Sequence, residues 1–186
     1  QLKKSVFGAS FYSNLKISND GKKLLWLQWD LPNMPWESSE LHTGDILESG
    51  DINNCNYIDG GNGKSIFQPE WDKNKIVYVR EVNDRGELFE FDGSCKKQII
   101  DLRIDLMKPL WVSGLVSYKI IDNEYIFATG WKIGRTKQVI INRLNNTYQE
   151  YDLNIISDHV CVSNSYIILA GSTEYSENEI MYIDIK

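Results

Sequence analysis

Apolar residues along the chain gather in short runs separated by polar turns, and four of these runs repeat. Each repeat starts between 41 and 52 residues after the one before it. A second apolar segment follows each run and ends in alternating apolar and polar residues, as in Phe89, Glu90 and Phe91. The first runs occupy residues 24–29, 76–81, 125–130 and 166–171, and the second segments occupy residues 40–47, 87–91, 138–142 and 179–185.

An alternation of period two indicates β-strands, because successive side chains of a strand point to opposite faces of the sheet. No long window shows apolar residues recurring at three and four positions, so we expect no helix. A repeat of about 40 to 50 residues that contains several short antiparallel strands is typical of a β-propeller blade. A β-sandwich also uses short strands and frequent turns, but it does not need internal similarity, and the repetition favours the propeller.

We therefore predict an all-β fold, namely a β-propeller with about four visible blades that is part of a larger propeller. The segments expected as innermost strands are residues 11–17, 66–71, 115–121 and 158–162. The predicted blades occupy approximately residues 10–50, 65–98, 114–150 and 158–186.

A loop rich in tryptophan and proline follows the first apolar run. Pro32 and Pro35 remove backbone donors and so stop sheet pairing, which predicts that Asp30 to Trp36 projects as a loop. The tryptophan at its end either packs against the protein or contacts a ligand. Farther along, the residues from Gly60 to Lys64 superficially resemble a phosphate-binding loop, but they lack its strand-to-helix context, so we expect a flexible connection between blades.

Composition and charge narrow the classes of function. The chain has 186 residues, of which 42% are hydrophobic, enough for one well-filled domain. The formal net charge of -6 is spread along the sequence without a basic stripe, which argues against nucleic acid as a partner. No apolar run approaches the roughly 20 residues of a membrane helix, so we expect no membrane partner. The three cysteines are far apart and lack CxxC spacing, which favours free thiols in a reducing compartment and a cytoplasmic location.

Several segments, in the same order along the chain, resemble a known family. These segments are residues 17–26 followed by 29–36, then 65–71, 88–93, 109–118 and 170–172. They resemble the β-propeller of the prolyl oligopeptidase superfamily of serine peptidases, most closely the enzymes related to dipeptidyl aminopeptidase and acylaminoacyl peptidase. The resemblance spans roughly residues 10 to 186. Two departures stand out: Leu31 occupies the position of a family histidine, which weakens any role of the loop in proton chemistry, and residues 72–75 lack the Ser-Pro-Asp-Gly turn.

The resemblance implies a function for a part of an enzyme. In that family the propeller lies over an α/β-hydrolase domain that carries a Ser-Asp-His triad, and it restricts which peptides reach the triad. No Gly-x-Ser-x-Gly nucleophile elbow occurs in this sequence, so we expect no hydrolase domain and no catalytic residue within it. The implied partners are a hydrolase domain of the same polypeptide and a peptide substrate. The alternatives are a stand-alone propeller that acts as a protein- or ligand-binding scaffold and, less favoured, an independent four-bladed enzyme.

Four residues are candidates for contact with a substrate, although ordinary packing or strand-end pairing is the favoured interpretation of each. Asp30 is a candidate partner for a substrate amine, and Trp36 and Trp111 for apolar or stacking contact. Glu70 is a candidate anchor for a peptide amino terminus near a central channel. The two histidines, at positions 42 and 159, lack a Cys or acid at ligand spacing, so we expect neither a metal nor a cofactor.

Overall fold

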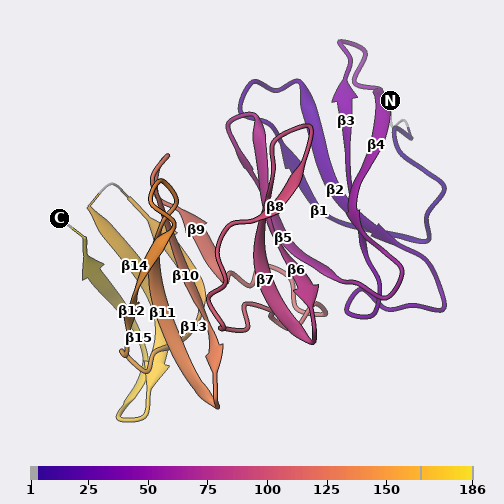
Figure 1. The fold of residues 1–186 in the computed structure, drawn as a ribbon. Helices are drawn as coiled ribbons and strands as arrows, with labels where there is room; N and C mark the ends of the chain where they lie inside the picture. Colours follow the sequence, from indigo (N-terminus) through magenta and orange to yellow (C-terminus); the bar gives the residue numbers. More distant parts are fainter. Residues whose placement is uncertain (1–3, 164, 186) are drawn as a thin grey trace. The chain divides into compact units, whose positions relative to one another are not determined.

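The computed structural model describes residues 4–163 and 165–185, and the regular elements within these residues are all β-strands. Fifteen strands form four antiparallel sheets in this described part of the chain (Figure 1). This arrangement confirms the all-β fold class. The chain divides into two compact units: the first contains the residues up to Val82 together with Phe89–Lys97, and the second contains Asn83–Leu88 and the residues from Gln98 onward.

The first sheet is a simple meander in which each strand pairs with the next along the chain. In the β2–β3 pair, Trp26 lies opposite His42 and Gln28 lies opposite Glu40. Since residues two apart on a strand share a face, these four side chains lie on one face of the sheet. The strands are β1 (Phe11–Ile17), β2 (Lys23–Trp29), β3 (Glu40–Ile46) and β4 (Ile52–Gly60).

The second sheet repeats the meander and packs on the first through an apolar core. Its strands are β5 (Ile66–Asp72), β6 (Lys75–Val82), β7 (Arg85–Phe91) and β8 (Lys96–Gln98). The core of this unit consists of Leu25, Leu27, Leu41, Ile58, Ile66, Ile76, Tyr78 and Phe89. Each of these side chains contributes on the order of 1.5–3 kcal/mol when fully removed from water, so the core is the main force that joins the two sheets.

The buried carboxylate of Asp59 on β4 links the two sheets by bonding to side chains of the second sheet. Asp59 Oδ2 accepts hydrogen bonds from Tyr78 Oη at 2.7 Å and Arg80 Nη1 at 3.0 Å, and Oδ1 accepts one from the Gly60 backbone N–H at 3.0 Å. Lys96 Nζ lies 3.5 Å from Asp59 Oδ1. Burial by itself raises the pKa of Asp59, but the hydrogen bonds and the Arg80 charge outweigh it and lower the pKa below its usual value. The ionised carboxylate therefore holds three strands together.

The second unit contains the two remaining sheets. The third sheet consists of β9 (Tyr118–Ile120), β10 (Tyr125–Lys132), β11 (Arg135–Asn142) and β12 (Thr147–Tyr151). The fourth sheet has three strands among the described residues: β13 (Ile156–Val162), β14 (Tyr166–Thr173) and β15 (Ser176–Asp184). The core of this unit consists of Phe127, Ile155, Val160, Ile167 and Leu169. One face of β14 is therefore buried, while Tyr166 and Ile168 on its other face are exposed.

The four repeated apolar runs form β2, β6, β10 and β14, and the second segments form β3, β7, β11 and β15. The sequence pattern does not reveal β4, β8 and β12, because these strands carry mostly exposed polar residues and show no alternation. The first sheet therefore extends through β4, beyond the residue 50 at which we drew the first blade. Residues 164 and 186, which fall within the predicted fourth blade, lie outside the described residues.

Candidate ligand pocket at the end of the first sheet

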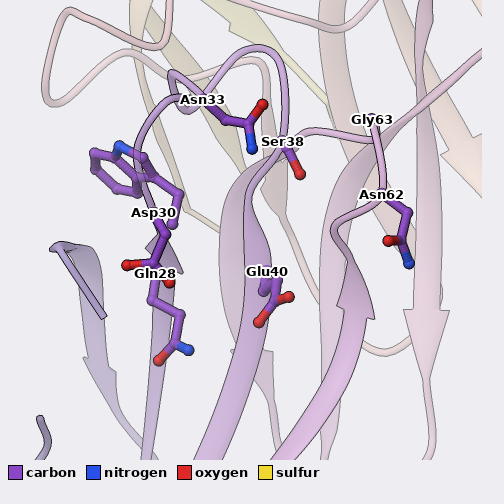
Figure 2. A pocket seen from close by; sticks show the side chains of 8 residues that line it. Gln28, Asp30, Asn33, Ser38, Glu40, Asn62 and Gly63 are labelled. Carbon is purple, nitrogen blue, oxygen red and sulfur yellow. The ribbon is translucent and has the colours of Figure 1, made fainter. Parts of the chain in front are cut away.

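A polar pocket of about 260 Å³ opens where β2 ends and β3 begins. The loop between these strands forms one wall, and the turn after β4 forms another (Figure 2). The prolines of the loop prevent it from continuing the β-ladder, so the backbone leaves the sheet and encloses this space. The lining residues are Gln28, Trp29, Asp30, Asn33, Ser38, Glu40, Asn62 and Gly63.

Asp30 is held in place from one side only. The backbone N–H and the hydroxyl of Ser10 both donate to its Oδ1, at 2.6 and 2.7 Å. These two hydrogen bonds lower the pKa of Asp30, the hydroxyl contributing most, so the group is ionised at neutral pH. Its second oxygen, Oδ2, accepts no hydrogen bond from the residues that the structure describes, which leaves it available to a ligand.

Gln28 and Glu40 form a cross-strand pair at the base of the pocket. Trp26 Nε1 donates to Gln28 Oε1 at 2.9 Å, and this contact orients the amide so that its nitrogen lies on the side of Glu40 (Figure 2). Glu40 Oε2 lies 2.8 Å from His42 Nε2. The His42 ring stacks on Trp26 at a centroid distance of 5.6 Å. Each polar group at the base is therefore oriented by a neighbour in the same sheet.

The two walls of the pocket are joined through Ser39, which is fully buried. Its backbone N–H donates to Lys64 O at 3.1 Å, and its backbone oxygen accepts from Gly61 N at 2.9 Å. Its hydroxyl accepts a hydrogen bond from Ile66 N at 2.9 Å. Gly60 approaches so closely that a Cβ there would lie 2.1 Å from Ser39 O, and its φ of +94° favours glycine. These contacts place residues 60–64 in a hydrogen-bonded turn, and the flexibility expected of this connection stays a prediction.

Within the loop, a short turn fixes the residues around Trp36. Glu37 N donates to Met34 O at 2.9 Å, and Met34 N donates to Glu37 Oε2 at 2.7 Å. The Trp36 side chain is 41% exposed. It belongs to the same loop as Asp30 but is not among the residues that line the pocket.

Glu70 lies on β5, outside the pocket lining, and already has a partner within the chain. Its Oε1 is 3.1 Å from Lys16 Nζ on β1, and the neighbouring Trp71 Nε1 donates to Lys16 O at 3.1 Å. A ligand amine at Glu70 would have to share or displace this lysine.

Trp111 belongs to the second unit, in the segment between β8 and β9, and its side chain is 69% exposed. Both ends of its loop are attached to β13. The buried Lys108 Nζ donates to Ser157 O at 3.1 Å and Asp158 Oδ1 at 2.9 Å, and Val116 N donates to Asp158 O at 2.9 Å. Of the four candidate residues, Asp30 is the one that lines the pocket.

Sequence reasoning missed the other polar lining residues, in particular Gln28, Glu40 and Asn62. Gln28 interrupts an apolar run and Glu40 begins the next strand, but only the strand register shows that the two face each other.

Among residues 4–163 and 165–185, no group of three or more His, Cys, Asp or Glu side chains is arranged to hold a metal ion. The same residues contain no helix with the length and apolar character needed to span a membrane.

Solved structures resemble the chain over most of its length. Puromycin hydrolase matches with a TM-score of 0.84 and 22% identity, covering 95% of this chain and 27% of its own. A puromycin-hydrolyzing peptidase from Mycobacterium tuberculosis matches with a TM-score of 0.82 and 18% identity, covering 98% of this chain and 28% of its own. TolB from Acinetobacter baumannii matches with a TM-score of 0.66 and 14% identity, covering 94% of this chain and 41% of its own. No protein-family model and no curated protein matches the sequence.

These likenesses show the fold. The chain has the β-propeller fold found in puromycin hydrolase, and it also resembles a structure of a prolyl endopeptidase with a TM-score of 0.66. The propeller, and not the β-sandwich, is therefore the correct one of the two architectures that the strand pattern allowed. The chain spans about a quarter of the length of the puromycin-hydrolyzing proteins that it matches.

Proposed function

We propose that the chain is the non-catalytic propeller portion of a serine peptidase, and that it gates and helps to recognise peptides for an α/β-hydrolase domain of the same polypeptide. The observation that carries the proposal is the match to puromycin hydrolase, which covers 95% of this chain but 27% of that protein. The order of the family-like segments from residue 17 to residue 172 adds independent support.

The pocket chemistry agrees with a role in peptide recognition. Its walls present side-chain amides from Gln28, Asn33 and Asn62, which both donate and accept hydrogen bonds. A peptide backbone offers the complementary N–H and C=O groups, and it has no need of a deep apolar cavity. Preformed polar walls of this kind bind without the cost of ordering a mobile loop.

The likeness to TolB favours, as a second candidate function, a propeller that acts without a peptidase domain. TolB has the same fold over 94% of this chain and does not bear the name of a peptidase. A stand-alone propeller that binds a protein or a ligand is therefore the second candidate.

We also propose a reducing, cytoplasmic compartment for the protein. Cys55, Cys95 and Cys161 are all exposed free thiols. Exposed unpaired thiols are typical of proteins in compartments where thiols stay reduced.

Hydrolysis by the full-length product of the gene tests the proposal. Its substrates are a series of peptides of increasing length that share one cleavage site, and the 186-residue chain alone serves as the control. We expect the full-length product to cleave short peptides, with a kcat/KM that falls steeply as the peptides lengthen, and the control to cleave none. Equal rates at every length would contradict gating, and no cleavage by the full-length product would contradict the peptidase and favour the scaffold.

A further inference from the structure

The turn between β10 and β11 carries a residue that its geometry disfavours. Ile133 and Gly134 are the two central residues of this turn, and both have a positive φ, of +50° and +73°. A two-residue hairpin turn of this geometry favours Asn, Asp or Gly at both positions, because a branched side chain crowds the backbone there. Ile133 is therefore held in a strained backbone conformation.

Two other turns of the chain have the same geometry and carry the favoured residues. The first consists of Asn62 and Gly63, with φ values of +50° and +75°, between the paired residues of an isolated β-bridge. The second consists of Asn83 and Asp84, with φ values of +51° and +60°, between β6 and β7. Asparagine thus occupies the first position in both, so a turn of this kind in this chain does not need isoleucine.

Packing within the chain does not compensate for the strain at Ile133. Its side chain is 97% exposed, so it contributes no burial that offsets the disfavoured backbone conformation. An asparagine at this position would suit the turn and would be better solvated. A residue that is both strained and exposed is a candidate for contact with a partner.

A second segment of the chain fixes the end of β10, from which the turn projects. Asp105 N donates to Trp131 O at 2.8 Å, and Trp131 N donates to Asp105 O at 2.9 Å. Gly130 lies so close to this segment that a Cβ there would be 2.3 Å from Asp105 O. The turn therefore presents Ile133 from a fixed position, which lowers the entropy cost of a contact.

The charges beside the turn indicate the chemistry of a partner surface. Lys132 Nζ lies 2.8 Å from Glu150 Oε2, so its charge is neutralised within the sheet. Arg135 is exposed and forms no ion pair with the residues that the structure describes. A surface that fits the turn has an apolar hollow for Ile133 and a carboxylate beside it for Arg135.

We propose that the β10–β11 turn is a contact between the propeller and another domain of the same polypeptide, with Ile133 as its apolar centre. A single turn offers far less than the roughly 800 Å² that each partner contributes to a stable interface between separate proteins. A linked domain needs less area, because the linker keeps its effective concentration high.

The proposed function supplies the identity of this domain. The match to puromycin hydrolase covers 27% of that protein, so most of that polypeptide lies outside the matched strands. We assign the contact to the α/β-hydrolase domain, and this assignment rests on the proposed function.

Photo-crosslinking in the full-length gene product tests the inference. The photoreactive residue p-benzoylphenylalanine replaces Ile133 in one variant and Leu144 in a control, and mass spectrometry identifies the crosslinked peptides. Leu144 is a suitable control because it is 75% exposed and lies in the turn at the other end of β11. We expect crosslinks from position 133 to the hydrolase domain and none from position 144.

Three results would overturn the inference: no crosslink from position 133, crosslinks from it only to the propeller or to a second copy, or equal crosslinking from position 144. Peptide hydrolysis by the same product keeps the two proposals separate. An active peptidase without the crosslink contradicts the contact alone, whereas a crosslink to another domain in a product that cleaves no peptide contradicts the peptidase alone.

Substitution by asparagine separates the contact from the strain. Because Ile133→Asn suits the turn better, the melting temperature of the full-length product should stay the same or rise if Ile133 has no partner. We expect it to fall by a few degrees instead, because the apolar contact is lost. Leu144→Asn should leave it unchanged. A melting temperature of Ile133→Asn at or above that of wild type would contradict the contact.

Discussion

At the scale of single residues, the hydrogen bonds from Ser10 lower the pKa of Asp30. Because its hydrogen bonds lower the pKa of the folded carboxyl, they stabilise the fold at pH values above the ordinary Asp pKa of about 3.9. That stabilisation is lost as the pH falls through the lowered pKa. Ser10→Ala should therefore raise the pKa of Asp30 toward its ordinary value, as measured by ¹³C NMR titration of the carboxyl carbon. Ser13→Ala on β1 is the control, and an unchanged Asp30 pKa in Ser10→Ala would refute the assignment.

Substitution of Trp36 tests whether this side chain contacts a peptide or only packs within the protein. Its side chain is 41% exposed, so we expect Trp36→Ala to cost less stability than the roughly 3–5 kcal/mol typical of a buried tryptophan. In the full-length product, the substitution should raise KM for peptides several-fold while the melting temperature falls by only a few degrees. Tyr175→Ala, at a side chain that is 95% exposed, should change neither value. A loss of stability without a change in KM would leave Trp36 as a packing residue alone.

The place of Asp30 at the start of the loop was predictable from the sequence, because the prolines that follow end the strand, and its contact with a substrate stays a prediction. Gln28 and Glu40 were not, because their roles depend on the β2–β3 register, which one strand read by itself does not reveal. Glu70 was recognised from the sequence as a candidate, but its ion pair with Lys16 could not be predicted. That pair depends on a contact between β1 and β5, which are far apart in the sequence.

At the scale of elements, the turn after β4 determines the shape of the pocket. Gly60→Ala should destabilise the protein by more than about 2 kcal/mol, because the new Cβ would meet Ser39 O at 2.1 Å. Gly63→Ala is a matched control, since it also has a positive φ, of +75°, but a Cβ there would meet open space. It should cost about 1 kcal/mol. Urea unfolding measures both, and equal losses would show that the close contact does not constrain the turn.

The Asp59 network should carry much of the stability between the first two sheets. Asp59→Asn removes the charge that faces Arg80 and Lys96, so we expect a loss of about 3 kcal/mol in urea unfolding, against little change for the half-buried surface variant Asp51→Asn. Because the pKa of Asp59 is lowered, wild type should lose this advantage as the pH falls below the ordinary Asp pKa, and the stabilities of wild type and Asp59→Asn should then converge. A difference that is constant down to low pH would contradict the role of the charge.

The strand pattern predicted the buried and half-buried elements well and the outer ones poorly. Strands such as β2 and β10 can be recognised in the sequence, because their buried positions carry apolar residues. Strand β4 carries consecutive exposed polar residues, and its place in the sheet depends on backbone pairing with β3, which leaves no mark in the hydrophobic pattern.

At the scale of the whole molecule, fold and function rest on different observations. The four sheets and the likeness to puromycin hydrolase show a propeller, and TolB shares that fold. The fold alone assigns no hydrolysis, which the proposed function attributes to an α/β-hydrolase domain of the same polypeptide. The proposal therefore depends on the rest of the polypeptide that contains these strands.

Labelling with a fluorophosphonate probe tests this dependence most directly, because the probe reacts with activated serine nucleophiles. The account predicts that the full-length gene product takes up the label at a single serine outside these 186 residues, whereas the isolated chain remains unlabelled. Labelling of a serine within the isolated chain, or a full-length product that takes no label, would contradict it.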